Sequence, residues 1–333
     1  MNPTISFKNK IEELINTKKQ ISAIEIRTTL GISKPTLFKH LHNLVEEKRI
    51  SKIGKPPKVY YVPVNVNEVS IGGRAQIVTS SPEIKQYIDE NYLIITPSGE
   101  WKSGWDGFFY WCTKTNQEIN KTARVYFETA HKYDKLKYNG LVVGTSKIRS
   151  TFPQNTFIDR VYYLDFYSIE GFGKTKLGQM LLYAKQSQNR KIINNLVGYV
   201  QPKIMQVIRS EHIDAIGFMP PTVKREVQLM KELERGINYG LPKIEIIKVT
   251  GEIAIPQKTL SKLSDRVENA ASTIIIQGQN VYKNILLIDD AVGSGASFNE
   301  TAKKIKERKL CTNTVIGLAI TGSLKGFDVI SEV

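Results

Sequence analysis

The stretch Ile285–Ser297, ILLIDDAVGSGAS, decides the fold. Its first four residues are apolar and predict a buried strand, which ends at two adjacent aspartates. A loop of small residues follows, and Phe298–Arg308 has the pattern of a helix, for which we expect Ser297 as N-cap and Glu300 to complete a capping box. Such a loop lets backbone N–H groups approach an anion, and a helix N-terminus favours negative charge. With two carboxylates that accept hydrogen bonds from sugar hydroxyls, the element predicts a site for a ribose and its 5′-phosphate.

This stretch resembles the signature of type I phosphoribosyltransferases, in which an apolar strand is followed by two acidic residues, two apolar residues and a Thr/Ser-rich loop. The resemblance implies that Asp289 and Asp290 hold the ribose hydroxyls of phosphoribosyl pyrophosphate (PRPP), while the loop holds the 5′-phosphate. Gly293 departs from the Thr or Ser usual in the family, so one side-chain contact to phosphate is expected to be missing. The implied PRPP-binding residues are Asp289, Asp290, Gly293, Ser294, Gly295, Ala296 and Ser297.

Two other protein classes also carry an apolar strand that ends in paired aspartates. A Walker B strand requires a phosphate-binding loop upstream, but the nearest pattern, Gly171–Thr175, would put Ser168 where the first glycine belongs. A receiver domain has its acidic pair near its own N-terminus, whereas this pair comes late in the chain. The phosphoribosyl site therefore remains the preferred interpretation.

Length and composition indicate an ordinary globular protein of two or three domains. The chain has 333 residues, of which 41% are hydrophobic and 24% charged. No apolar run approaches the ~18 residues of a membrane span, and the N-terminus lacks the apolar core of a signal peptide. The two cysteines have no metal-ligand spacing. We therefore expect a cytoplasmic protein without a membrane partner.

The net charge of +15 is concentrated at the N-terminus. Residues 1–63 hold 12 Lys and Arg against 5 Asp and Glu, a net of +7 in less than a fifth of the chain. The remaining 270 residues hold 35 against 27, a net of +8. This asymmetry favours a polyanionic partner for the N-terminal segment, although a solvated basic surface would have the same charge.

The N-terminal pattern predicts three helices and a basic hairpin. Phe7–Ile15 has helical spacing, Ser22–Glu25 forms a capping box, and Ser33 caps a third helix with Pro35 in its first turn. Two short strands then flank Gly54–Lys58. The order resembles a bacterial winged helix-turn-helix, whose third helix enters the DNA major groove; the alternative is a winged helix used for protein docking. The resemblance implies the DNA-binding residues Ser33, Lys34, Thr36, Lys39, His40, Asn43, Lys55 and Lys58.

The middle of the chain carries no catalytic constellation. Its aromatic cluster, Trp101–Trp111, is interpreted as core or a domain interface, with a base-stacking surface as the alternative. Asn116–Leu136 predicts one helix and Leu141–Val143 a short strand. We expect three regions: a winged helix at 1–64, an α+β region of unknown role at 65–155, and a phosphoribosyltransferase-like domain at 156–333.

The last region alternates strands with helices, which predicts an α/β fold with a mainly parallel sheet. Ligands bind at the carboxyl ends of such strands. The predicted strands are Val161–Phe166, Asp214–Phe218, Ile244–Val249, Ile274–Ile276, Ile285–Asp289 and Val315–Ile320; the predicted helices include Lys176–Lys185 and Val223–Glu234.

The order of these pieces resembles the ComF-like branch of the phosphoribosyltransferases, known from DNA-uptake competence. The resemblance implies a pyrophosphate loop of Pro220, Pro221, Thr222, Val223, Lys224 and Arg225. It also implies a lid within Gly251–Asn269 that includes Gln257, Lys258 and Arg266; an ordered connection is the alternative. The cysteines that bind zinc in that branch are absent here, and so is its Arg-Gly-Phe-Asn stretch.

Two functions remain open at this stage. A winged helix joined to this fold resembles the purine-repressor architecture, in which PRPP is an effector, so we expect a PRPP-responsive transcriptional regulator that binds DNA, as a possible homodimer. The first alternative is an active phosphoribosyltransferase, with Asp289, Asp290, Lys224 and Arg225 as catalytic residues and Mg2+ bound through PRPP rather than directly by the protein. The second is a DNA-processing, competence or defence factor.

Overall fold

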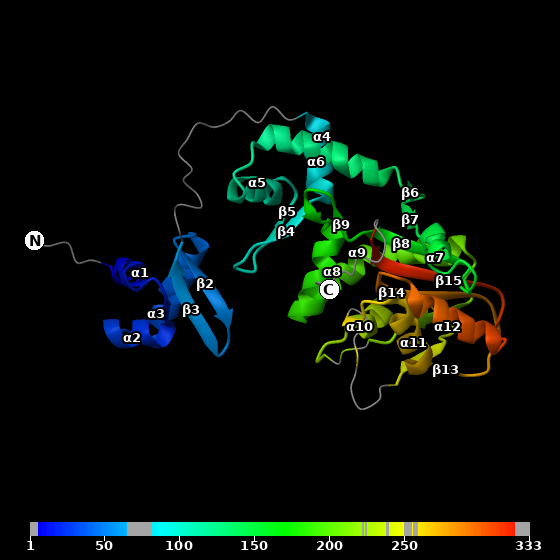
Figure 1. Ribbon diagram of the computed structural model, residues 1–333. Helices are drawn as coiled ribbons and strands as arrows, with labels where there is room; N and C mark the ends of the chain where they lie inside the picture. The colour runs from blue at the N-terminus through cyan, green and yellow to red at the C-terminus, as the bar shows by residue number, and fades with distance from the viewer. Residues whose placement is uncertain are drawn as a thin grey trace, which may run out of the picture. The chain divides into compact units, whose positions relative to one another are not determined.

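The computed structural model describes residues 6–64, 81–221, 223, 225–237, 240–249, 255 and 259–323, and the side chain of Lys55 is not among them. The chain divides into two compact units, Met1–Ile77 and Val78–Val333 (Figure 1). The predicted middle region therefore falls mostly within the second unit, together with the predicted phosphoribosyltransferase-like region.

The first unit consists, in its described part, of three helices and a small antiparallel sheet with strand order β1-β3-β2. Its core is formed by apolar side chains from every helix, among them Ile11, Ile26 and Leu41, each exposed by no more than 1%. The elements are α1 (Phe7–Lys18), β1 (Ile21–Ser22), α2 (Ala23–Leu30), α3 (Lys34–Glu46), β2 (Ile50–Lys55) and β3 (Lys58–Pro63).

The helix starts predicted for this unit are confirmed. The Ser22 hydroxyl accepts a hydrogen bond from the Glu25 amide, and the Glu25 carboxylate accepts one from the Ser22 amide, which completes the capping box of α2. The hydroxyl of Ser33 caps α3, with Pro35 in its first turn. Each cap satisfies N–H groups that a helix start otherwise leaves without partners.

A helical layer opens the second unit. Phe108 is fully buried between these helices, with Trp105 and Trp111 packed against it, so the core interpretation of the aromatic cluster is confirmed for these side chains. Phe109 is 43% exposed. The elements are α4 (Pro82–Asn91), β4 (Leu93–Ile95), β5 (Trp101–Ser103), α5 (Gly104–Lys114) and α6 (Ile119–Asp134).

The main sheet has the order β11-β14-β15-β8-β7-β6 among the described residues. Strands β11, β14, β15 and β8 are parallel, whereas β7 and β6 join antiparallel at one edge, so the predicted mainly parallel sheet is confirmed. The strands are β6 (Lys137–Tyr138), β7 (Leu141–Val143), β8 (Arg160–Phe166), β11 (Ala215–Phe218), β14 (Tyr282–Val292) and β15 (Cys311–Gly322).

Helices cover both faces of this sheet because alternate strand residues point to opposite sides. Leu286 and Ile288 pack into the core shared with α8, α9 and α10, whereas Ile285 and Leu287 pack into the core shared with α7, α11 and α12. In Figure 1, α12 is drawn in orange beside α11 and β13. The covering helices are α7 (Thr145–Thr151), α8 (Lys176–Ser187), α9 (Arg190–Ser210), α10 (Leu229–Ile237), α11 (Leu263–Thr273) and α12 (Ala296–Glu307).

Two sequence expectations about these elements are wrong. The strands β12 (Glu245–Lys248) and β13 (Ile274–Gln277) form an antiparallel pair of their own. The chain just before β12 meets the main sheet through an isolated parallel bridge between Lys243 and Ile216 of β11. A second small pair consists of β9 (Ser168–Ile169) and β10 (Gly173–Lys174). Helix α10 begins at Leu229 rather than at Val223, and the long helix α9 was not predicted.

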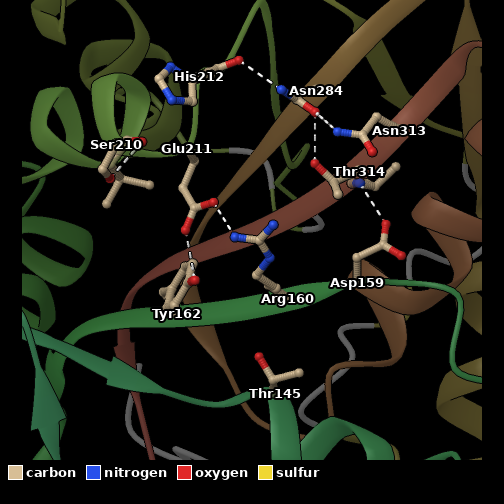
Figure 2. A network of polar contacts seen from close by, with 12 residues as sticks. Thr145, Asp159, Arg160, Tyr162, Ser210, Glu211, His212, Asn284, Asn313 and Thr314 are labelled. Atoms are coloured by element: carbon tan, nitrogen blue, oxygen red, sulfur yellow. Dashed lines mark hydrogen bonds and ion pairs between the residues drawn. The ribbon is translucent and has the colours of Figure 1, made fainter.

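A polar network fixes the amino ends of the parallel strands, opposite to the ends where α/β proteins bind ligands (Figure 2). The buried amide of Asn284 donates to the carbonyl of His212 and accepts hydrogen bonds from Asn313 and Thr314, at 2.8 to 3.0 Å. The Asp159 carboxylate accepts a hydrogen bond from the Val315 amide at 2.7 Å. These contacts hold the register of β14 and β15.

Tyr163 of β8 lies against two glycines, Gly144 after β7 and Gly322 at the end of β15. A Cβ atom on Gly144 would lie 2.5 Å from the Tyr163 hydroxyl, and one on Gly322 would lie 2.3 Å from its ring. Tyr163 is 2% exposed. Its ring fills space that is open only because both neighbouring residues are glycines, which have no Cβ atom.

None of the helices in the described ranges has the length and apolar character that crossing a membrane requires.

Candidate functional site

A cavity of about 250 Å³ lies where β11 and β14 end. It is bordered by the loop after β14, the loop after β11, the end of α8, and parts of β12 and α11. The lining residues are Lys185, Met219, Pro220, Pro221, Val223, Arg225, Gln228, Leu229, Met230, Lys248, Arg266, Ile274 and Asp289 through Phe298. The predicted acidic pair, the predicted phosphate loop and the described part of the predicted pyrophosphate loop thus share one cavity.

The loop after β14 leads directly into the N-terminus of α12. Gly295 has a left-handed backbone (φ 79°) and is the N-cap, with no side-chain cap, so the expected capping box of Ser297 and Glu300 is wrong. The backbone turns into the helix two residues earlier than expected, which puts Ser297 inside the first turn. The Ser294 hydroxyl accepts a hydrogen bond from the amide of Ala296, the first residue of the helix, at 3.4 Å. An uncapped helix start presents N–H groups to an anion in the cavity.

The two aspartates differ in their surroundings. An oxygen of Asp289 accepts the Asp290 amide hydrogen bond at 2.8 Å. Burial, and then the charge of Asp290, raise the pKa of Asp289 above its ordinary value, while Lys185 and Lys248 act in the opposite direction. Asp290 instead forms an ion pair with Lys185, whose ammonium nitrogen lies 2.9 Å from its carboxylate oxygen.

The end of α8 therefore contacts the site, which no local sequence pattern predicted. Besides the ion pair of Lys185, the side chain of Gln188 at the helix C-cap accepts a hydrogen bond from the Val227 amide at 3.1 Å. This second contact ties the helix end to the segment that follows Arg225. One helix end thus contacts both the last part of β14 and the segment before α10.

Three more cations line the cavity. Arg225 follows β11, Lys248 ends β12, and Arg266 lies in α11 with only 5% exposure. Burial lowers the pKa of Lys248 and of Arg266, and the nearby Asp289 opposes this for Lys248. The Arg266 Nε donates to the Leu260 carbonyl at 2.7 Å. With Lys185 there are four cationic side chains against two carboxyl groups on the described lining, which suits a ligand with several negative charges.

Some predicted site residues lie outside the described part of the chain. These are Thr222 and Lys224 of the predicted pyrophosphate loop, and Gln257 and Lys258 of the predicted lid. Pro220, Pro221, Val223 and Arg225 line the cavity.

The candidate DNA-binding residues lie in the first unit. Lys34 and Lys39 of α3 are exposed, as is Lys58 at the start of β3, whereas Thr36, His40 and Asn43 are half-buried. Ser33 is occupied in capping α3. The backbone of Lys55 ends β2 opposite Lys58.

Comparison with known proteins gives only partial likenesses. No family model and no curated protein sequence matches the chain. Hypoxanthine phosphoribosyltransferase from Staphylococcus aureus is 13% identical over 38% of this chain and 60% of its own, with a TM-score of 0.23, so the chain spans about three fifths of that protein. The enzyme from Trypanosoma cruzi is 12% identical over 41% and 68%, with a TM-score of 0.27.

Proposed function

We propose that the second unit binds PRPP, or a related ribose 5-phosphate ligand, in the cavity where β11 and β14 end. The observation that carries this proposal is a single arrangement: two adjacent carboxyl groups, Asp289 and Asp290, beside the uncapped start of α12, within one cation-lined cavity. Carboxyl oxygens suit a sugar diol, and a helix start suits a phosphate. These are also the residues that resemble the type I phosphoribosyltransferase signature.

Each part of the ligand then has a partner of matching chemistry. The ribose hydroxyls would donate to Asp289 and Asp290, and the 5′-phosphate would accept from backbone N–H groups between Gly293 and Ser297. Arg225 would neutralise the pyrophosphate, with Lys224 proposed from the sequence alone. Mg2+ is part of the ligand in this proposal, since it prefers phosphate oxygens and usually retains several waters.

For the first unit we propose a winged helix that binds DNA. Its order of helices and strands, α1-β1-α2-α3-β2-β3, and its sheet order support this proposal. The exposed lysines of α3, Lys34 and Lys39, would face the major groove, and Lys58 a phosphate. The whole chain would be a PRPP-responsive transcriptional regulator in the cytoplasm and would act as a homodimer. Its winged helix would span residues 1–64 and its ligand-binding domain residues 156–333.

An active phosphoribosyltransferase is the second candidate. Arg225 and Lys248 favour it, because they supply more positive charge than a 5′-phosphate needs and would stabilise a leaving pyrophosphate. Displacement at the anomeric carbon by a nitrogen base would then depend on positioning and on charge stabilisation by the two aspartates.

Calorimetric titration with Mg2+ and PRPP tests the ligand. Wild type should bind, Asp289→Asn and Asp290→Asn should each bind at least about tenfold more weakly, and Asp106→Asn, an exposed change on α5, should bind as wild type. Absence of binding by the wild type overturns the proposal. Pyrophosphate release with a panel of nitrogen bases would decide for the enzyme over the regulator.

DNA binding is tested by affinity against salt concentration. Lys34→Ala and Lys39→Ala should each weaken binding and reduce the salt slope by about 1, whereas Lys18→Ala at the end of α1 should not. If PRPP leaves the DNA affinity of the wild type unchanged, the proposal of a PRPP-responsive regulator is wrong, even if the protein binds both PRPP and DNA.

A further inference from the structure

The ion pair between Lys185 and Asp290 lies in the wall of the proposed ligand cavity. The side chains are 16% and 21% exposed, and both residues line the cavity. An ion pair that is this well shielded from water is held in one geometry more firmly than a surface pair.

Lys185 is also well placed by its helix. It lies in the last turn of α8, where the helix dipole favours a cation. Gln188, one turn on, accepts a hydrogen bond from the Val227 amide, so the helix end is also tied to the segment before α10.

The position of Lys185 has a consequence for the ligand. Asp289 and Asp290 are neighbours, and PRPP or ribose 5-phosphate brings more negative charge to them. Without a cation beside it, the Asp290 carboxylate would repel the phosphate-bearing ligand, although its oxygens have to accept hydrogen bonds from the hydroxyls of that ligand. The ammonium group of Lys185 offsets this repulsion. It contacts one oxygen of the Asp290 carboxylate, and the other oxygen can accept a hydrogen bond from a hydroxyl.

We propose that Lys185 is a positioning residue for the ligand diol: its ammonium group holds the Asp290 carboxylate oriented to accept a ribose hydroxyl and offsets the negative charge of that carboxylate. This inference rests on the proposed function of the cavity. It makes recognition of the sugar hydroxyls, rather than of the phosphate alone, depend on a residue of α8.

The test compares ribose 5-phosphate with 2-deoxyribose 5-phosphate, and ribose 5-phosphate with 3-deoxyribose 5-phosphate, by calorimetry. Each pair differs in one hydroxyl, so their affinity ratios report diol recognition separately from phosphate binding. Wild type should prefer ribose 5-phosphate by about tenfold or more over at least one analogue, because that analogue leaves a carboxylate without its donor.

Lys185→Met should reduce that preference to about twofold or less, and Lys185→Arg should retain most of it because the cation is kept. Lys191→Met, an exposed change at the start of α9, removes the same charge and should keep the wild-type preference. Adding Lys185→Met to Asp290→Asn should reduce the preference no further than Asp290→Asn alone, since both changes act on one pair.

The outcomes separate this inference from the function on which it rests. If the wild type binds none of the sugar phosphates, the proposed function fails and the inference falls with it. If the wild type discriminates and a folded Lys185→Met, checked by its circular dichroism, discriminates equally well, only the role of Lys185 is overturned. Loss of preference in Lys185→Arg as large as in Lys185→Met would also overturn it.

Discussion

Ile148 occupies the space in which a side chain at Gly295 would begin. A Cβ atom at Gly295 would lie only 2.0 Å from the Cδ1 atom of Ile148, which is buried in α7. The loop after β14 is therefore packed from behind by a residue from a distant part of the chain. Its glycine is required both by this contact and by its left-handed backbone.

We expect Gly295→Ala to destabilise the protein by about 2–5 kcal/mol. The left-handed backbone costs a side chain about 1–2 kcal/mol, and overpacking against Ile148 adds about 1–3 kcal/mol. The matched control is Gly293→Ala, whose Cβ would meet its nearest neighbour, Arg266, at 3.8 Å. Denaturant unfolding checks the difference, and equal stabilities of the two variants would contradict the packing argument.

Asp289→Asn should stabilise the protein at neutral and alkaline pH. The pKa of Asp289 is raised in the folded state, so the folded protein binds more protons than the unfolded chain between the ordinary and the raised value. The free energy of unfolding of the wild type therefore falls as pH rises through that window. The variant has no carboxyl group at position 289 and does not show this decrease.

The expected gain for Asp289→Asn is about 1–3 kcal/mol at pH 8 and close to zero near pH 4. Asp290→Asn is the contrasting variant, because it leaves the shielded Lys185 without its carboxylate and should destabilise. Thermal unfolding from pH 4 to pH 9 measures both. A gain for Asp289→Asn that does not grow with pH would refute the argument.

Asn284→Ala should destabilise the protein without changing the proposed site. It leaves the His212 carbonyl and the donors of Asn313 and Thr314 without their buried partner, at a cost of about 2–3 kcal/mol. Because this network lies at the opposite end of the strands, affinity for ribose 5-phosphate should stay within about twofold of the wild type at low temperature. A larger loss of affinity would mean that the two ends of the sheet are coupled.

Ser22→Ala should weaken the first unit by about 1 kcal/mol. The change removes the hydroxyl that caps α2 and leaves the Glu25 amide without its acceptor. Faster hydrogen exchange of the α2 amides is the expected result, with α12 as the internal reference. Unchanged exchange in α2 would show that the cap is dispensable.

The parts of the fold that local sequence predicts are those set by local chemistry. The apolar run Ile285–Ile288 and the small residues after it specified a strand, a loop and a helix, and the caps at Ser22 and Ser33 specified two helix starts. Residue type favours Ser297 as the N-cap of α12, but the helix starts earlier. The left-handed backbone of Gly295 turns the chain into the helix two residues before Ser297.

Other elements depend on contacts that local sequence does not reveal. Helix α9 contains Pro202, which normally ends a helix. Here Leu196, Val200 and Ile204 are completely buried on one face, and this packing outweighs the lost hydrogen bond. Similarly, α10 starts late because the segment before it is held by Gln188.

The sequence predicts the segment that contains the aspartates and the glycine loop, but not the lysines that line the same cavity. The carboxyl pair and the glycine loop form one continuous segment, so the sequence alone could single them out as candidates, and they line one cavity. Lys185 and Lys248 come from α8 and β12, and only the folded sheet brings them to Asp289 and Asp290. The residues around a single lysine in the sequence do not show whether its side chain faces water or a ligand.

The position of Tyr163 between Gly144 and Gly322 links three sites that lie far apart in the chain. A methyl group added at either glycine would overlap the ring, so it becomes tolerable only when the tyrosine is replaced by a smaller residue. Among homologues, these positions should therefore vary in concert: a bulky aromatic with two glycines, or a smaller residue with alanines. The evolutionary record of this sheet would then carry a three-way correlation, which an alignment of sufficient depth should reveal.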